Sequence, residues 1–430
     1  MLSYLIPLAT FETVLWRSLR QLHCSHENVA VFLCKQMNHD RVRWTKFSNW
    51  PTGMAELPNL AIPLDLQEQL LPPEQLSILT FLQYPLPSIV HAADATNCGI
   101  ESYFSPLLPT VVTAERIRTI PIPPFTIVEQ LGKHPELTSA KSVVCAHAPG
   151  SNNERIPTWC LKFWLKVLHI KPIKQEWLAA EESLQKMRQR RDRTDETLAL
   201  ISQIYNMLSC ISWSEDLKGF SARISTRFLA TYLTVDWLND EHESQMLDLL
   251  RHEIHYRGNM KINVGDIFFI SKLKEVSKRP ADYGSSSRYI WLRRKGEELN
   301  DGTFNKFVVI SNIRQNHWVA IVVDFECFQI HYGDSLGMVI DEELEDALTW
   351  WIYYHTGQYF TVSDLPITRQ HDAYSCGILA WNGIMVHLFP KEYQLLNPAT
   401  LVYERLHIFL CITNRHNDRA SLILLNCNNT

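Results

Sequence analysis

Three closely spaced runs of strand-forming residues constrain the fold of this chain more than any other feature. Residues 306–313 and 318–324 are rich in Val and Ile, and a third run at 327–335 follows after a short connection. Strands joined by such short connections pair antiparallel and return to the same end of a sheet. We therefore expect His317, in the first turn, to lie near Asp334, although 17 residues separate them in the sequence.

A helix is predicted to begin at Cys376. The apolar residues after it recur at helical spacing: Ile378, Leu379, Trp381, Ile384, Met385 and Leu388. A thiol is a good nucleophile near neutral pH only if its pKa falls below about 8.5. The positive end of the helix dipole and the free N–H groups of the first turn favour a thiolate at this position.

These residues together form a nucleophile with its base. His317 holds the proton of the Cys376 thiol, and Asp334 orients the imidazole and stabilises its charged form. The oxyanion of a tetrahedral intermediate requires preorganised N–H donors. The backbone N–H of Cys376 is one candidate, and the side-chain amide of Gln370, six residues earlier, is the other.

The motifs that carry these residues resemble a known family. They are His317-Trp318, Asp334-Ser335, Gln370-x5-Cys376-Gly377 and, upstream, Trp237-Leu238-Asn239-Asp240. In this order they are similar to the C-terminal catalytic domain of the ubiquitin-like-protein proteases, the Ulp and sentrin-specific (SUMO) proteases. The resemblance covers roughly residues 213–415. It implies an α+β, papain-like cysteine protease domain with a central mixed or antiparallel sheet flanked by helices.

The resemblance also implies a role for each matched residue. His317, Asp334 and Cys376 match the catalytic triad, and Gln370 matches the oxyanion residue. Trp237 and Trp318 match the aromatic residues that clamp the Gly-Gly tail of the modifier, although packing in the core is an alternative for both. Asp240 matches an acidic residue that pairs with the modifier, and a helix cap is an alternative role that is compatible with it.

Two differences from the family pattern lie near the expected tail channel. Ser375 stands where Asp is usual, and His371-Asp372 replaces a Pro/Asn-rich pair. Neither position takes part in the chemistry directly. These differences therefore bear on the choice of modifier more than on activity.

The function implied is that of a cysteine-type peptidase or isopeptidase. It cleaves after the C-terminal glycine of a ubiquitin-like modifier, with SUMO favoured, and it needs no cofactor and no metal. Its partners are the modifier and its conjugates. Two alternatives remain open: an acyltransferase that uses the same triad, and a modifier-binding or mobile-element-derived relic with weak catalysis.

Composition limits the class of protein further. The chain has 430 residues, 46% of them hydrophobic, and a net charge of −5, so a nucleic-acid partner is not predicted. The ten cysteines lack a repeating spacing, which fits a reducing intracellular compartment, the nucleus and/or the cytoplasm. No run of 18 apolar residues is present to span a membrane, and residues 1–20 favour a buried helix or strand pair over a secretory signal.

The chain is expected to divide into three regions. Residues 1–150 form an N-terminal region of unknown role, and 12 of the 21 prolines lie in its segment 51–125. Residues 151–212 are a helical connector, so that the part before the protease domain is mainly helical and interrupted by proline. Residues 213–430 form the protease domain.

Two clusters outside the motifs have ordinary interpretations. Arginines 188, 190, 191 and 193 are read as a solvated helix face, with a nuclear-import or nucleic-acid patch as the alternative. The group His23, Cys24, His26, Cys34 and His39 does not match the spacing of a zinc site, so no metal is predicted there.

Overall fold

The computed structural model describes residues 60–91, 99–144, 154–259 and 261–427. They form two compact units. One, the helical unit, contains the described residues from 60 to 219, residues 223–234 and the chain from residue 413 onward. The other, the sheet unit, contains residues 220–222 and 235–412. The histidine and cysteine group at 23–39 lies outside the described residues.

The helical unit is built around a pair of helices. Its elements are α3 (Leu64–Leu70), α4 (Ile78–Gln83), η2 (Ile100–Tyr103), β1 (Phe104–Ser105), α6 (Ala114–Thr119), α7 (Phe125–Lys133), η3 (Pro135–Thr138), β2 (Ser142–Val144), β3 (Arg155–Ile156), α8 (Cys160–Gln189), α9 (Asp195–Cys210), η4 (Thr226–Phe228) and α10 (Leu229–Tyr232). The side chain of Thr194 caps α9 by accepting from the N–H of Thr197, 3.2 Å away. The sequence predicts either one long helix or a pair over 174–208, and the structure has the pair.

Helix α8 differs from the prediction because it runs through Pro172. The sequence predicts a helix at 159–170, before the helical stretch at 174–208, and proline inside a helix removes a backbone donor and clashes with the preceding turn. In the structure the helix continues from Cys160 to Gln189. Large apolar side chains on both sides of the proline are fully buried, among them Trp164 and Trp177. Their burial offsets a local cost of about 3 kcal/mol.

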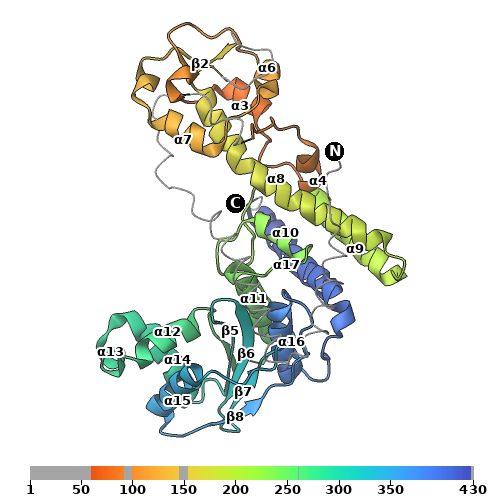
Figure 1. The fold of residues 1–430 in the computed structure, drawn as a ribbon. Helices are drawn as coiled ribbons and strands as arrows, with labels where there is room; N and C mark the ends of the chain where they lie inside the picture. The colour runs from red at the N-terminus through yellow and green to blue at the C-terminus, as the bar shows by residue number, and fades with distance from the viewer. Residues whose placement is uncertain (1–59, 92–98, 145–153, 260, 428–430) are drawn as a thin grey trace, which may run out of the picture. The chain divides into compact units, whose positions relative to one another are not determined.

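The sheet unit contains a five-stranded mixed sheet between two groups of helices (Figure 1). Its elements are α11 (Asp240–Tyr256), β4 (Ile262–Val264), α12 (Phe269–Ser277), α13 (Pro280–Ser285), η5 (Ser287–Tyr289), α14 (Ile290–Asn300), β5 (Lys306–Ile313), β6 (His317–Asp324), β7 (Gln329–Gly333), α15 (Glu342–Thr356), β8 (Thr361–Asp364), α16 (Cys376–Leu388) and η6 (Pro398–Thr400). Helix α17 (Leu401–Cys427) begins in this unit.

The strands follow the order β4-β5-β6-β7-β8. The central strands β5, β6 and β7 are antiparallel, whereas β4 and β8 pair parallel with their neighbours. The β5–β6 pairing begins with Ile313 opposite His317, so the turn between them occupies residues 314–316. Both Arg314 and Gln315 have positive φ angles in this turn, 51° and 62°.

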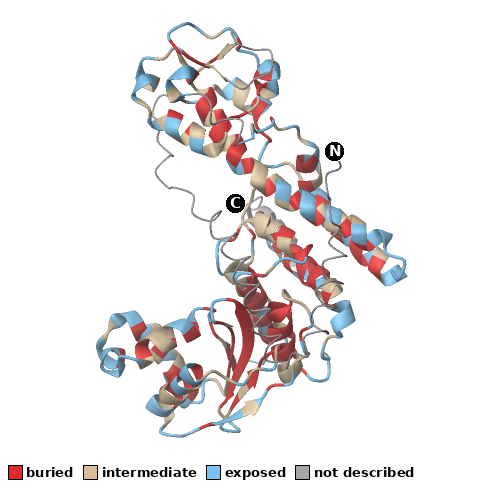
Figure 2. Cartoon of the chain, viewed as in Figure 1, coloured by how far each residue is buried: buried red, intermediate tan, exposed pale blue. Residues whose placement is uncertain are grey.

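Alternate residues of the central strands point to opposite faces of the sheet. One face, with Phe307, Val309 and Ile321, packs against α12, α14 and α15. The other face, with Val308 and Trp318, packs against α11 and α16. Every residue of β6 is buried, which is why the central strand is uniformly red in Figure 2. The predicted α+β class with a helix-flanked mixed sheet is therefore confirmed.

The end of the chain differs from the prediction. The sequence predicts a closing helix over 399–413 followed by a strand-like or ragged tail. In the structure α17 extends to Cys427. Buried side chains continue past residue 413, with Thr413 and His416 almost fully covered, so the helix keeps packing partners beyond the predicted end.

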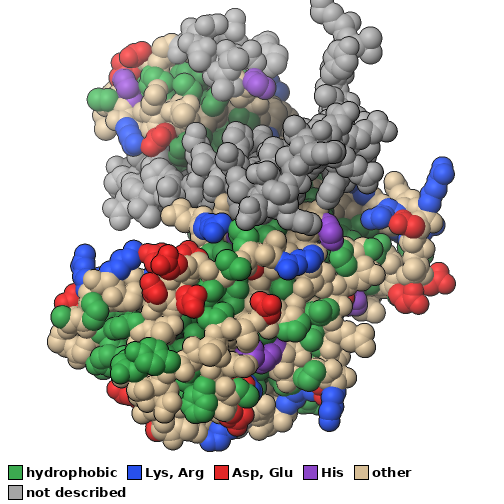
Figure 3. Space-filling view, turned by 60° about the horizontal axis from the view of Figure 1, so that its bottom comes forward, with side chains coloured by type: hydrophobic (Ala, Val, Ile, Leu, Met, Phe, Trp, Pro, Cys, Tyr) green, Lys and Arg blue, Asp and Glu red, His purple; other side chains and the backbone are tan. Residues whose placement is uncertain are grey.

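Charged side chains of both signs are mixed on the molecular surface. The face drawn in Figure 3 has Lys and Arg side chains interspersed with Asp, Glu and hydrophobic ones. Among the described residues, no helix is both long and apolar enough to cross a membrane.

Candidate active site

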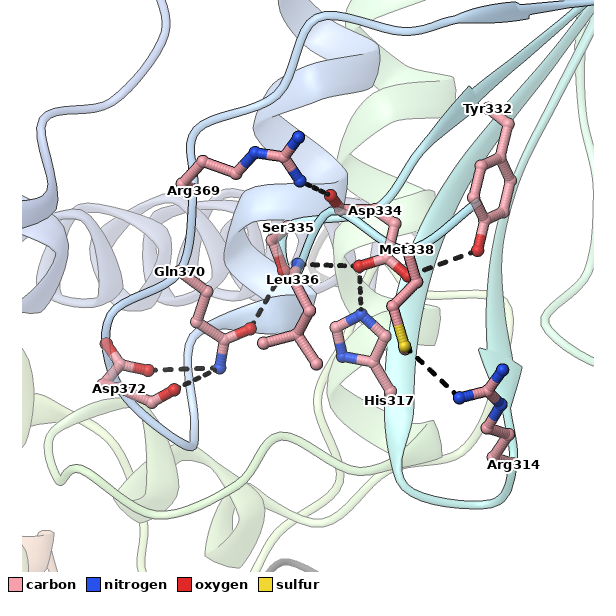
Figure 4. A network of polar contacts seen from close by, with 10 residues as sticks. All are labelled: Arg314, His317, Tyr332, Asp334, Ser335, Leu336, Met338, Arg369, Gln370 and Asp372. Atoms are coloured by element: carbon pink, nitrogen blue, oxygen red, sulfur yellow. Dashed lines mark hydrogen bonds and ion pairs between the residues drawn. The ribbon is translucent and has the colours of Figure 1, made fainter. Parts of the chain in front are cut away.

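The end of the sheet at which β6 begins and β7 ends holds a buried histidine–aspartate pair. His317 is the first residue of β6, and Asp334 directly follows the last residue of β7. The two side chains are joined by His317 Nε2 and Asp334 Oδ1 at 2.9 Å (Figure 4). His317 is 0% exposed and Asp334 is 4% exposed. The hairpin thus brings the two predicted residues together.

Asp334 is held in place by several donors. Its Oδ1 also accepts from the backbone N–H of Leu336 at 2.7 Å, and its Oδ2 accepts from the Tyr332 hydroxyl at 3.3 Å. Burial raises the pKa of Tyr332, so the phenol stays protonated and remains a donor. Arg369 donates to the backbone carbonyl of Asp334 at 3.3 Å. A carboxylate with this many donors has a fixed direction toward the imidazole.

Cys376 is the first residue of α16, as the periodicity predicts. The thiol is 4% exposed and belongs to the same apolar cluster as Trp318 of β6, against which α16 packs. The first turn of an α-helix has backbone N–H groups with no acceptor inside the helix. The thiol therefore lies at the end of α16 where the backbone N–H groups of the first turn are available as donors.

The electrostatics couple the three residues. Burial by itself lowers the pKa of His317, but the hydrogen bond to Asp334 and the interaction with Cys376 outweigh it and raise that pKa to about 9. Because Nε2 faces Asp334, Nδ1 is the nitrogen left for the thiol, and no hydrogen bond joins it to a described residue. The imidazole is therefore prepared to become the protonated partner of a thiolate.

Gln370 lies in the loop before α16 and is anchored to Ser335. Its backbone N–H donates to the Ser335 carbonyl at 2.8 Å, and its Oε1 accepts from the Ser335 hydroxyl at 2.9 Å. Its Nε2 donates to the backbone carbonyl of Asp372 at 2.8 Å and lies 3.3 Å from the Asp372 carboxylate (Figure 4). The amide orientation is thus fixed, with its donors on the side of Asp372 in this structure.

Asp372 organises the turn that leads into Cys376. Its carboxylate accepts from the N–H groups of Tyr374 and Ser375 and from the Ser375 hydroxyl, at 2.9, 2.8 and 2.7 Å. All three partners are donors, which suits an acidic side chain. Asp372, from the pair His371-Asp372, is therefore bound to Ser375, the other departure from the family pattern.

The remaining predicted residues differ in accessibility. Trp318 is only 4% exposed, and its indole N–H donates to the Leu238 carbonyl at 3.0 Å. Trp237 is partly exposed, packs on the cluster that contains Cys376 and donates to the Ala373 carbonyl. Asp240 is the first residue of α11, but Asn239 is the cap of that helix, so the capping alternative for Asp240 is wrong.

Glu243 belongs to this site but was not predicted from the sequence. It lies on α11, is 0% exposed, and is close enough to Cys376 to interact with it electrostatically. A signal for it exists: residue 243 precedes the apolar residues Leu247 and Leu250 by four and seven positions. An acidic residue therefore occupies the buried face of an amphipathic helix.

A cluster at the other end of β6 resembles a metal site. Asp324, His331 and His387 place possible ligand atoms within 4.8 Å of one another. Burial lowers the pKa of both histidines, that of His387 to about 4, so both are neutral. Asp324, however, is already paired with the ammonium group of Lys306, and His331 Nδ1 is bonded to Ser363 Oγ at 2.8 Å. The positive charge beside Asp324 therefore comes from the Lys306 ammonium group.

Comparisons with known proteins give likenesses to solved structures alone. No protein-family model and no curated protein matches the chain. It is similar to the C-terminal Ulp1 protease domain in complex with Smt3, the yeast ortholog of SUMO, with 19% identity and a TM-score of 0.38 over 50% of this chain and 93% of that one. It is also similar to the catalytic domain of the Ulp1-like SUMO protease of Chaetomium thermophilum, with 19% identity and a TM-score of 0.39 over 55% and 88%.

A third similar structure is the Xanthomonas campestris effector XopD bound to ubiquitin. The identity is 21% and the TM-score 0.29, over 40% of this chain and 91% of that one.

Proposed function

We propose that residues 213–430 form a cysteine-type peptidase or isopeptidase that cleaves after the C-terminal glycine of a ubiquitin-like modifier, with SUMO as the favoured modifier. One observation carries the proposal. The fully buried His317 is bound through Nε2 to Asp334, and its Nδ1 is left for the thiol of Cys376, the first residue of α16. This is the arrangement of nucleophile, base and orienting group that acyl transfer from an amide requires.

The reaction follows from these positions. The Cys376 thiolate attacks the carbonyl carbon of the C-terminal glycine, and the C–S bond forms as the carbonyl π electrons move to oxygen. His317 then gives its proton to the leaving amine, and the C–N bond breaks to leave a thioester. Water adds to the thioester as His317 removes its proton, and the C–S bond breaks to release the carboxylate and restore the thiolate.

The oxyanion of each intermediate needs two donors. The N–H of Cys376 at the start of α16 is one. The second is an N–H of Gln370, which reaches the oxyanion when its 3.3 Å contact with the Asp372 carboxylate gives way. The Ser335 hydroxyl donates to Gln370 Oε1 and so keeps this amide oxygen turned away from the oxyanion.

Substrate recognition is assigned to residues beside the thiol. Trp237, partly exposed and packed on the cluster that contains Cys376, is the aromatic surface for the glycine tail. Trp318 supports it from the core, and Asp240 contacts the globular part of the modifier. A thiolate nucleophile is kept reduced in a reducing compartment, so we propose that the protein resides in the nucleus and/or the cytoplasm. The region before residue 213 would bind substrates or partners.

The test is covalent capture by modifiers that carry a C-terminal electrophile. The full chain is incubated with SUMO, ubiquitin and other ubiquitin-like modifiers so equipped, and the adduct is located by mass spectrometry. We expect an adduct at Cys376, fastest with SUMO, that is lost in Cys376→Ala and retained in the control Cys327→Ala, because Cys327 is an exposed thiol. If only another modifier were captured, that modifier would replace SUMO as the proposed substrate. If no modifier were captured at Cys376, the proposal would be overturned.

The same samples separate the two alternatives. Labelling of Cys376 by acetyl-coenzyme A without capture by any modifier would indicate the acyltransferase. Equal binding of a modifier by wild type and Cys376→Ala, with no adduct and no hydrolysis in either, would indicate a binding relic.

A further inference from the structure

A carboxyl group with no hydrogen bond is buried directly behind the proposed nucleophile. Glu243 of α11 is 0% exposed, and neither Oε1 nor Oε2 has a hydrogen-bond partner among the described residues. Burying an ionised carboxylate without partners costs several kcal/mol, and a group in that position takes up a proton instead. The environment of Glu243 thus favours the neutral acid.

This carboxyl group lies against the helix that carries Cys376. A Cβ atom added to Gly377 would lie 1.8 Å from Glu243 Oε1 and 2.8 Å from its Cδ. Gly377 directly follows the nucleophile, so the absence of its side chain is what makes room for the carboxyl group. Glu243 and the first turn of α16 are therefore in direct van der Waals contact.

The charged groups that face Glu243 come from three helices. Cys376 of α16 and Asp240 of α11 disfavour its ionised form, and Arg405 of α17 favours it. Burial is the largest influence, and the pKa of Glu243 lies well above its usual range. Arg405 is itself fully buried and donates to the Asp236 carbonyl at 2.7 Å. His317 also interacts with Cys376, and its protonated ring supplies positive charge there.

We propose that Glu243 is a positioning residue for Cys376 that is buried as the neutral acid in the resting site. As the neutral acid it supports the first turn of α16 without placing charge behind the thiolate. Once ionised, it sets a second negative charge beside the sulfur and opposes the developing oxyanion. The site then has two groups that end its activity at high pH, His317 by losing a proton from its ring and Glu243 by losing one from its carboxyl. This inference rests on the proposed function only in taking Cys376 as an activated thiol.

The charge beside the sulfur can be measured with a matched pair of alkylating reagents. In both cases the thiolate attacks the CH₂ carbon, the S–C bond forms and iodide leaves. Iodoacetate is an anion and iodoacetamide is neutral, so the ratio of their rates at Cys376 reports the local charge and cancels the fraction of thiolate. The rates are followed by mass spectrometry on the full chain between pH 5 and 10, with no modifier present.

We expect the rate ratio to decline through about pH 9 in wild type and in Glu243→Gln as His317 loses its proton. The ratio for wild type should decline further, so that at high pH it is lower than the ratio for Glu243→Gln by about threefold or more. Glu243→Leu, which is also neutral, should follow Glu243→Gln and replaces it if that variant folds poorly. The control Asp248→Asn alters a buried carboxylate of the same helix that is bound to Ser221 and Arg251, and it should follow wild type.

The outcomes separate this inference from the proposed function. Superimposable profiles for wild type and Glu243→Gln would overturn the inference and reduce Glu243 to a packing residue. A higher ratio in Glu243→Gln already at pH 6 would also overturn it, because Glu243 would then be ionised throughout. If Cys376 of wild type reacted no faster than the exposed Cys327 at neutral pH, the thiol would not be activated and the proposed function itself would fail.

Discussion

His317 and Asp334, 17 residues apart in the chain, are joined by a 2.9 Å contact between Nε2 and Oδ1. Both side chains are buried, so this pair is shielded from solvent and from salt. Exposed ion pairs contribute about 0–1 kcal/mol to the stability of a fold. A buried and hydrogen-bonded pair can in addition shift the pKa of its histidine by more than one unit. The pair therefore determines the protonation state of the base that faces Cys376.

The first prediction concerns Asp334→Asn. Asp334 is one of the groups that raise the pKa of His317 to about 9, so its loss should move the alkaline limit of activity downward, toward the ordinary histidine value. The amide also favours the wrong tautomer of the ring, and kcat should fall by about 10⁴. The measurement is the pH profile of hydrolysis of a modifier fused to a fluorescent amine. An unchanged alkaline limit would contradict the assigned role of Asp334.

The second prediction links the same shift to stability. A histidine whose pKa is higher in the folded than in the unfolded state stabilises the fold below its unfolded pKa, and that contribution is lost as the pH rises through the folded value. For His317 the window runs from about 6.5 to about 9, which corresponds to about 3 kcal/mol. The free energy of unfolding of wild type, measured in urea, should decrease across this window relative to His317→Gln. Parallel curves for the two proteins would contradict the shift.

The third prediction compares the oxyanion donor with its anchor. Gln370→Ala should lower kcat by about 10²–10³ with little change in KM, because one donor to the oxyanion is lost. Ser335→Ala should lower kcat less, since the Ser335 hydroxyl only fixes the direction of the amide by donating to Gln370 Oε1. If both variants raised KM and left kcat unchanged, Gln370 would bind substrate instead of stabilising the oxyanion.

The fourth prediction is a double-mutant cycle between α11 and α16. Gly377→Ala should destabilise the protein and slow alkylation of Cys376, because the new methyl group overlaps the Glu243 carboxyl group. Glu243→Ala makes room for it, so the double variant should recover part of the stability and part of the alkylation rate. If the changes in the free energy of unfolding of the two single variants simply added in the double variant, the two residues would not be coupled.

The part of the site that could be predicted from the sequence is the part fixed by local pattern. The turn at 314–316 and the strands beside it place His317 next to Asp334, and the spacing of apolar residues after Cys376 marks a helix start. Both signals depend on residues close together in the chain. The pairing of the two strands and the geometry of the helix then determine where these side chains lie in space.

What could not be predicted depends on packing between distant segments. Whether Trp318 is a clamp or a core residue depends on what covers it, and the structure buries it and binds its N–H to Leu238. The contact of Glu243 with Gly377 joins two helices that lie more than 130 residues apart in the sequence. The continuation of α8 through Pro172 likewise depends on the burial of its tryptophans, which a local rule about proline does not include.

Cleavage of a SUMO conjugate tests the central claim most directly. Four proteins are compared: the wild-type chain and the variants Cys376→Ala, His317→Ala and Cys327→Ala. Each is mixed, in excess over substrate, with SUMO joined to a target by an isopeptide bond, and the released SUMO and amine are quantified in a single turnover. The account predicts SUMO ending in its C-terminal glycine from wild type and Cys327→Ala, and none from the other two. Equal release from wild type and Cys376→Ala, or release from none of the four with any ubiquitin-like modifier, would contradict it.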